Sequence, residues 1–275
     1  MRASGWAIVV AAPMALAALA GCSGGGGAPP GITPETPAPR LLFETDAARC
    51  DNLLLFQFVE FSATDAYLPP GYRPRDPQDF LDSPAPTGQA ALTLTLLECK
   101  DWQYSGEPLR TGFLGIYIDP PQVPGSGDPS PINFYEVERY GDDPTGALDS
   151  LGWPRVVTNV SFQTDTLATK AAPRAQVTDA DGLLIEVATY PATEYSLADG
   201  PVRFWHDLEG GTGYFDYDFP LRPDFGPVRC IARAGSTLAD IAGATTCPPA
   251  DPLGATFPNL AFEGNFTFLP GIHTQ

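Results

Sequence analysis

Positive charge is scarce in this chain. Of its 275 residues, 15 are Lys or Arg and 33 are Asp or Glu, and lysine occurs only as Lys100 and Lys170. The formal charge of −18 repels nucleic acid and anionic lipid headgroups, because both are bound through basic surfaces that release counterions. The composition therefore predicts that nucleic acid is not a partner.

Histidine is as rare as lysine, and the sequence lacks several common catalytic motifs. Only His206 and His273 are present, and we find no HExxH and no Gly-rich phosphate loop. This excludes a multi-histidine metal site and a recognisable triad, so we predict no metal and no cofactor. The acidic runs that begin at Asp179 and Asp216 lack the distal Glu of a calcium loop, and we interpret them as a tight turn and a solvated strand face.

The first residues have the pattern of a secretory signal peptide. Arg2 precedes an uncharged apolar run from Trp6 to Ala20, which contains Pro13 and is shorter than the ~20 residues of a comfortable membrane span. We therefore predict that residues 1–21 are a targeting segment that is removed.

The end of this segment, Leu-Ala-Gly-Cys22, resembles the lipobox of bacterial lipoproteins. The resemblance implies that Cys22 carries acyl chains such as palmitate and becomes the N-terminus of an exported protein anchored in the cell envelope membrane. Ser23 follows instead of Asp, which favours the outer membrane if the cell is Gram-negative. The alternative is an ordinary signal peptide with an incidental cysteine.

The residues after Cys22 predict a tether followed by one domain. Residues 22–40 consist mostly of Gly, Pro and Ala, which bury too little apolar surface to fold alone. No linker divides residues 41–275, and their length suits a single β-rich domain.

The remaining cysteines agree with export, since four is an even number and no pair has CxxC spacing. Cys50 precedes the strand-like run LLLFQFVEF, and Cys99 ends the run ALTLTLLEC. If these strands are antiparallel neighbours, the start of one lies beside the end of the other. We therefore predict the disulfides Cys50–Cys99 and Cys230–Cys247.

Short runs of β-type alternation between turn signals fill most of the chain, and helical periodicity is nearly absent. The predicted helices are Thr64–Leu68 and Ser236–Ile241, the second capped by Ser236 or Thr237. The fold class is predicted as all-β with minor short helices, a barrel or curved sandwich. The predicted strands are Leu53–Ser62, Ala90–Glu98, Gly112–Asp119, Ile132–Tyr140, Val156–Thr164, Ala175–Thr178, Leu183–Tyr190, Val202–Asp207, Gly213–Phe219, Val228–Ala234 and Leu260–Leu269.

The order of several short segments resembles the acetoacetate decarboxylase-like superfamily. These segments are FQFVEFSATDAYLPPGYRP followed by AALTLTLLEC, then INFYEVERYGDDPTGALDSLGWPRV, and finally EGGTGYFDYDFPLRPDFGPVRCIARAGSTLADIAG with NLAFEGNFTF. The resemblance spans most of residues 53–268 and implies a closed, cone-like β-barrel around a small apolar cavity.

The family's Schiff-base lysine lies in a Pro-Lys-Lys element, and this chain has Pro154-Arg155-Val156 at the matching place. A guanidinium stays protonated and cannot form the imine. We therefore expect Arg155 to pair with the carboxylate or carbonyl of a small organic ligand, with Trp153 covering its apolar part. A solvent-facing Arg155 beside a turn is the alternative.

Three functional hypotheses follow from this resemblance. The first is an anchored protein that binds a small organic acid or apolar carbonyl compound without Schiff-base chemistry. The second is a lyase that acts on a keto or hydroxy acid through Arg155 and a carboxylate such as Glu136 or Glu138. The third is a purely structural surface protein.

Overall fold

Strands make up most of the fold, and the predicted all-β class with minor helices is confirmed. The computed structural model describes residues 38–79, 87–102, 108–127, 130, 132–141, 149, 152, 155–156, 158–163, 173–189, 195–196, 202–218, 222–223, 226–247 and 253–272. The predicted signal peptide, Cys22 and most of the tether lie outside these residues.

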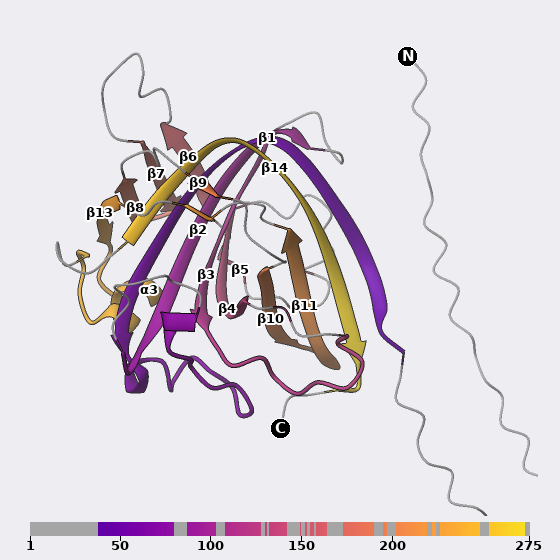
Figure 1. The fold of residues 1–275 in the computed structure, drawn as a ribbon. Coiled ribbons are helices and arrows are strands. Elements are labelled where there is room, and N and C mark those ends of the chain that lie inside the picture. Colours follow the sequence, from indigo (N-terminus) through magenta and orange to yellow (C-terminus); the bar gives the residue numbers. More distant parts are fainter. Residues whose placement is uncertain are drawn as a thin grey trace, which may run out of the picture. The chain divides into compact units, whose positions relative to one another are not determined.

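The strands (Figure 1) are β1 Arg40–Glu60, β2 Gln89–Trp102, β3 Leu109–Tyr117, β4 Ile132–Gly141, β5 Arg155–Val156, β6 Asn159–Gln163, β7 Arg174–Asp179, β8 Gly182–Thr189, β9 Tyr195–Ser196, β10 Val202–Leu208, β11 Gly211–Asp218, β12 Arg222–Pro223, β13 Gly226–Ala232 and β14 Leu253–Pro270. The helical elements are η1 Phe61–Ala63, η2 Pro77–Asp79 and α3 Thr237–Ala242.

One of the two predicted helices is confirmed. The side chain of Ser236 accepts a hydrogen bond from the Ala239 amide and caps α3, and Gly243 ends the helix in the left-handed conformation. The predicted helix at Thr64–Leu68 is wrong, because the short helix is η1 and only turns follow it. The Pro69-Pro70 pair comes too soon for a second helical turn to form.

Seven strands pair in a circuit. The sheet order runs β1-β2-β3-β4-β10-β11-β14, and β14 also pairs with β1. β13, β8, β7 and β6 continue the sheet from β14, and β5 pairs with β4. The cone shape that the resemblance implies stays a prediction.

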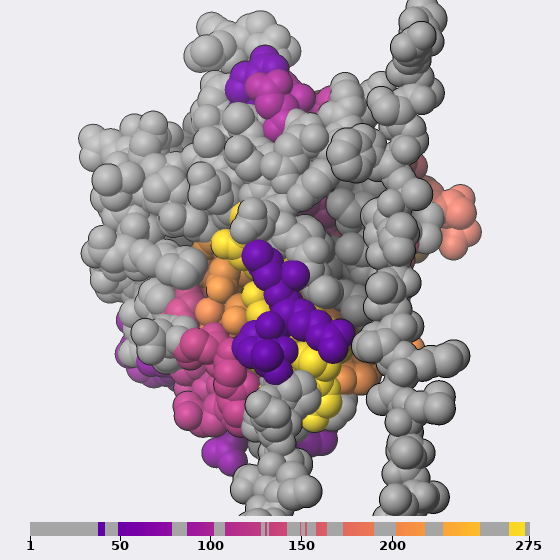
Figure 2. Space-filling view, turned by 90° about the vertical axis from the view of Figure 1, so that its right-hand side faces the viewer, coloured from indigo at the N-terminus to yellow at the C-terminus, as the bar shows by residue number. Residues whose placement is uncertain are grey.

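β1 and β14 are much longer than the sequence predicts. They lie side by side along most of their length (Figure 1), from the pair Arg40–Phe268 to the pair Phe56–Leu253. Figure 2 shows the indigo start of the described chain against the yellow end of β14. The first half of β1 has no clear alternation, and its register shifts on both sides of Cys50. Pairing with β14 from Arg40, joined by pairing with β2 from Ala47, extends β1 where the local pattern does not predict a strand.

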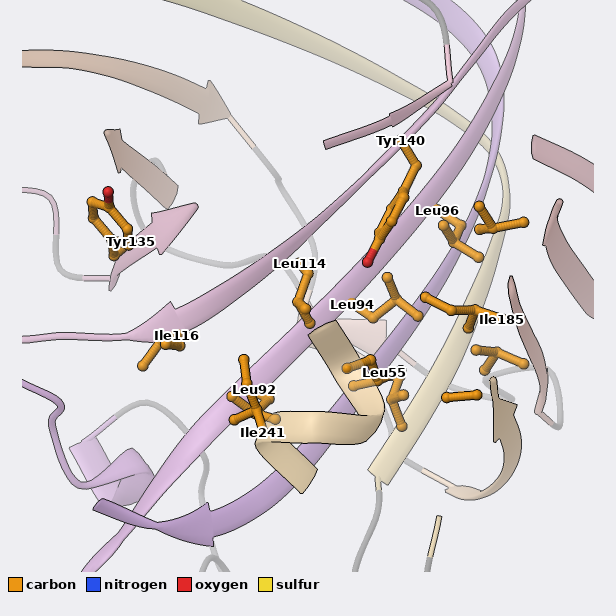
Figure 3. Packing of buried hydrophobic residues seen from close by; sticks show 14 of the residues in the cluster. Leu55, Leu92, Leu94, Leu96, Leu114, Ile116, Tyr135, Tyr140, Ile185 and Ile241 are labelled. Carbon is orange, nitrogen blue, oxygen red and sulfur yellow. The ribbon is translucent and has the colours of Figure 1, made fainter. Parts of the chain in front are cut away.

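The two faces of the seven-strand circuit bury different side chains. An aromatic cluster contains residues from these seven strands alone, including Phe56, Phe113, Phe134, Phe204, Phe215, Tyr217 and Phe266. A mainly aliphatic cluster lies on the other face. It contains residues of these strands together with residues of α3, β7, β8 and β13. Figure 3 shows part of this second cluster, with Ile241 of α3, Ile185 of β8 and the leucines of β1 and β2.

Both predicted disulfides are present in the structure. Cys50 and Cys99 are direct partners on the antiparallel strands β1 and β2 and are bonded to each other, as the sequence argument expects. Cys230 of β13 is bonded to Cys247, which follows α3. Among the described residues, no helix has the length and apolar character needed to cross a membrane.

Candidate functional site

A β-bulge in β4 places two charged residues on the same face of the sheet. Gly115 of β3 faces Glu136, but the next residue back on β3, Leu114, faces Glu138, so Val137 is an extra residue. The extra residue reverses the alternation of side chains beyond it. Glu136 and Arg139, three residues apart, therefore point to the same side.

These two residues form an ion pair that is closed to solvent. The Nε and Nη2 atoms of Arg139 donate to Oε1 and Oε2 of Glu136 at 2.8 Å and 2.9 Å, which is the bidentate geometry of strong arginine–carboxylate pairs. The side chains are 0% exposed for Glu136 and 5% exposed for Arg139. A charged pair at this depth is uncommon, because removing two charges from water costs several kcal/mol per ion.

Aromatic rings surround the guanidinium of Arg139. Its Cζ lies 5.9 Å from the ring centroid of Phe113 and 5.6 Å from that of Phe215. Both distances are within the range of cation–π attraction. Tyr217 is hydrogen-bonded to Arg139 through its side chain, so β4 and β11 are joined through this group. The result is one polar cluster, Glu136–Arg139–Tyr217, within the aromatic cluster.

Burial and charge act in opposite directions on this polar cluster. Burial alone would lower the pKa of Arg139, but the Glu136 carboxylate and the Tyr217 side chain more than offset it, so the pKa is raised and the guanidinium stays charged. Burial also raises the pKa of Tyr217, although Arg139 acts against that shift. Tyr217 is therefore a neutral hydroxyl at physiological pH.

His206 of β10 adjoins the polar cluster. Its Nδ1 lies 2.9 Å from the Glu136 carbonyl oxygen, so Nδ1 carries the proton in the neutral ring. The pKa of His206 is lowered to about 4, and burial is the largest cause. The charge of Arg139 also lowers this pKa, whereas the hydrogen bond to the Glu136 carbonyl acts in the opposite direction. His206 is thus a neutral imidazole at physiological pH, and its hydrogen bond to the Glu136 carbonyl holds the backbone beside the bulge.

The lowered pKa of His206 predicts that stability falls with acidification. Between pH 6.5 and about 4, the unfolded histidine is protonated and the folded one is not, so the unfolded state binds more protons and the free energy of unfolding falls as the pH falls. The loss should total at most about 3 kcal/mol. His206→Asn keeps a donor for the Glu136 carbonyl and cannot titrate.

Urea unfolding of the wild-type protein and His206→Asn, measured from pH 7 to pH 4, tests this expectation. Other carboxylates titrate in both proteins, so the difference between the two curves isolates the histidine. The wild-type protein should lose stability faster below pH 6.5. Parallel curves would show that His206 has an ordinary pKa in the folded state.

The sequence-predicted Arg155 lies in register with this site. β5 pairs in parallel with β4, and the backbone partner of Arg155 is Arg139. Trp153 lies outside the described residues. The structure therefore brings the backbone of Arg155, on β5, next to the charged pair on β4. Both predicted carboxylates, Glu136 and Glu138, are also on β4.

The two predicted carboxylates are separated by the bulge. Glu136 belongs to the polar cluster, whereas Glu138 faces the aliphatic cluster, where the Tyr140 hydroxyl donates to its Oε2 at 2.6 Å. Burial raises the pKa of Glu138, and hydrogen bonds from Tyr140 and from Thr237 of α3 act against that shift. Tyr140 itself projects into the aliphatic cluster (Figure 3). Glu138 joins β4 to α3 and does not share a face with Arg139.

Other charged residues of interest have structural partners. Lys100 is half-exposed with its Nζ 3.3 Å from Asp51, and Lys170 lies outside the described residues. Asp179 forms an ion pair with Arg233, and Asp216 pairs with Arg203 at 2.6 Å, so both acidic runs are bound by arginine. The described residues contain no group of three His, Cys, Asp or Glu side chains arranged for a metal ion.

Sequence reasoning missed Arg139 and Tyr217. Arg139 has no motif around it, and strict alternation from Glu136 would put it on the opposite face. Tyr217 lies between Asp216 and Asp218, and the pattern of this run points only to its carboxylates. A bulge depends on pairing between strands, so the sequence of β4 alone contains no signal for it.

Several solved structures have a similar fold. The enduracididine biosynthesis enzyme MppR in complex with pyruvate has a TM-score of 0.52 and 14% sequence identity, with 88% of this chain and 92% of that chain covered. The same enzyme with HEPES buffer bound also gives 0.52, at 13% identity and coverages of 87% and 88%. The acetoacetate decarboxylase of Legionella pneumophila gives 0.53 at 9% identity, with coverages of 86% and 87%.

These similarities confirm the predicted acetoacetate decarboxylase-like resemblance at the level of the fold. No family model and no curated relative matches the sequence. The fold alone does not assign an activity, because one fold can host unrelated functions.

Proposed function

We propose that this protein is an envelope-anchored lipoprotein that binds a small organic acid, with a carbonyl or apolar body, without forming a Schiff base. The bound acid meets Arg155 and the polar cluster of Glu136, Arg139 and Tyr217. The acetoacetate decarboxylase-like fold supplies the framework.

The buried Glu136–Arg139 pair is the observation that carries this proposal. A purely structural core gains little from such a pair, because apolar residues of similar volume are often equally or more stabilising. Here the pair lies among aromatic rings and is hydrogen-bonded to Tyr217. Apolar walls with a few convergent polar groups are typical of small-molecule sites.

The charges around this pair favour an anionic ligand. Glu136 and Arg139 cancel each other, and Arg155, in register with Arg139, adds one positive charge. Two arginines and one glutamate have a formal sum of +1, which a monocarboxylate neutralises. In this proposal the planar fork of Arg155 holds the carboxylate by paired hydrogen bonds.

One neighbouring structure supports the proposed chemical class. MppR, which has a similar fold, has been solved with pyruvate, a small keto acid. Imine chemistry requires a lysine amine, and this chain has Arg155 at the position that resembles the family's lysine element. Lys100 is half-exposed beside Asp51, so it lacks the burial that keeps a catalytic lysine amine neutral.

Arg155→Ala should lose at least about 2 kcal/mol of affinity for the acid, roughly thirtyfold, because a charge-assisted contact is removed. Arg155→Lys should recover part of this loss, since it restores the charge but not the bidentate geometry. Calorimetric titration with a panel of short keto, hydroxy and unsubstituted acids provides the measurement. Arg229→Ala on β13 removes an exposed arginine and serves as the control. Equal affinity in Arg155→Ala and the parent would refute the proposed role.

A further inference from the structure

Asn52 of β1 is a buried polar residue in the aromatic cluster. It is 3% exposed. On the same strand, Cys50 and Phe56 belong to the aromatic cluster and Leu54 packs against it, and the cross-strand partner of Asn52 is Leu97, another member. Alternation along β1 therefore directs the Asn52 side chain to the same face as Arg139.

The carbonyl oxygen of this side chain has no partner within the described part of the chain. Oδ1 of Asn52 is fully buried and accepts no hydrogen bond there. An unsatisfied buried acceptor costs about 1–3 kcal/mol in general, so most native structures avoid one. An acceptor aimed into a binding site is satisfied when the ligand provides a donor.

Asn52 and the charged pair lie in neighbouring rows of the sheet. One row runs through the register partners Leu54, Thr95, Phe113, Arg139 and Arg155. The adjacent row, two residues further along each strand, runs through Asn52, Leu97, Thr111 and Gly141. Rows two residues apart on one strand are about 7 Å apart.

The strand order puts Asn52 across from the arginines. β1 and β4 are separated by β2 and β3 in one direction and by β14, β11 and β10 in the other. They are therefore on opposite sides of the circuit of seven strands. A ligand whose carboxylate meets Arg155 has its far end towards β1.

We propose that Asn52 is a second anchor of the site and accepts a hydrogen bond from a hydroxyl or N–H group at the end of the ligand remote from its carboxylate. This inference rests on the proposed function and narrows the ligand class. It assigns the ligand to short acids with a distal donor, such as straight-chain acids with a terminal hydroxyl. A donor next to the carboxylate would not reach Asn52.

The test uses matched pairs of four- to six-carbon straight-chain acids, with and without a terminal hydroxyl, titrated into the purified protein. The wild-type protein should prefer the best hydroxy acid over its parent acid by at least about fivefold. Asn52→Leu, which has a similar shape and no acceptor, should reduce this preference to about one. Asn52→Ala gives the same readout if leucine does not fit.

The ligand-free proteins provide a second readout. Asn52→Leu removes an unsatisfied acceptor, so its unfolding midpoint should be equal to or above that of the wild type. A clearly lower midpoint for both variants would show that Asn52 is satisfied within the protein and would overturn the inference. So would a hydroxyl preference that is absent in the wild type or unchanged in Asn52→Leu.

Failure of the proposed function gives a different result. If no acid of either kind binds the wild-type protein, organic-acid binding itself is refuted, and the role of Asn52 is refuted with it. If acids bind through Arg155 but the terminal hydroxyl has no effect, only the role of Asn52 is refuted.

Discussion

Glu136→Gln should lower the free energy of unfolding by about 3–5 kcal/mol, because it leaves the buried guanidinium of Arg139 without its counter-charge. Arg139 is 5% exposed and cannot recover the loss by contact with water. Its raised pKa also prevents it from becoming neutral. Urea unfolding at pH 7 measures the effect.

Two further variants isolate the cause of this loss. Glu138→Gln changes the other glutamate of β4, which faces the aliphatic cluster and accepts from Tyr140, and should cost about 1 kcal/mol or less. The double variant Glu136→Gln with Arg139→Met removes both charges and should recover most of the stability. A cost below about 1 kcal/mol for Glu136→Gln would mean that the pair is open to water in solution.

Cys22→Ala should move the protein from the membrane fraction to the soluble fraction. Several acyl chains on one residue give stable anchoring, and the variant has no thiol to carry them. Fractionation of the native host, followed by immunoblotting, measures the distribution. Mass spectrometry of the wild-type N-terminal peptide should find acyl chains on Cys22.

The folded domain provides the control for this variant. Cys22→Ala should keep both disulfides and the unfolding midpoint of the parent, because Cys22 is not one of the four disulfide-bonded cysteines. If the variant stays in the membrane and keeps residues 1–21, the segment is a permanent membrane anchor and the lipoprotein assignment is wrong.

The fold class could be predicted from the sequence because its signals are local. Alternating apolar residues indicate β2, short apolar runs between turn signals indicate β3 and β10, and a serine before an apolar turn indicates α3. The pairing of Cys50 with Cys99 followed from the order of two strand-like runs. The sequence predicts only part of the long β1 and β14, because the unpredicted half of each strand pairs with the predicted half of the other.

The site was only partly predictable. The resemblance to the decarboxylase element identified Arg155, and the structure brings its backbone beside Arg139. The partner of Arg139 depends on the bulge at Val137, which is a property of two strands in register. The unsatisfied oxygen of Asn52 is likewise visible only when its neighbours are known.

Native mass spectrometry of the protein purified from its own host tests the central claim most directly. The proposal predicts a bound small organic acid that is released on denaturation, reduced in Arg155→Ala, and not made covalent by borohydride. A wild-type protein that carries no ligand, even after incubation with the acid panel, would contradict the proposed binding. A covalent adduct on Lys100 or Lys170 after borohydride reduction would contradict the absence of Schiff-base chemistry.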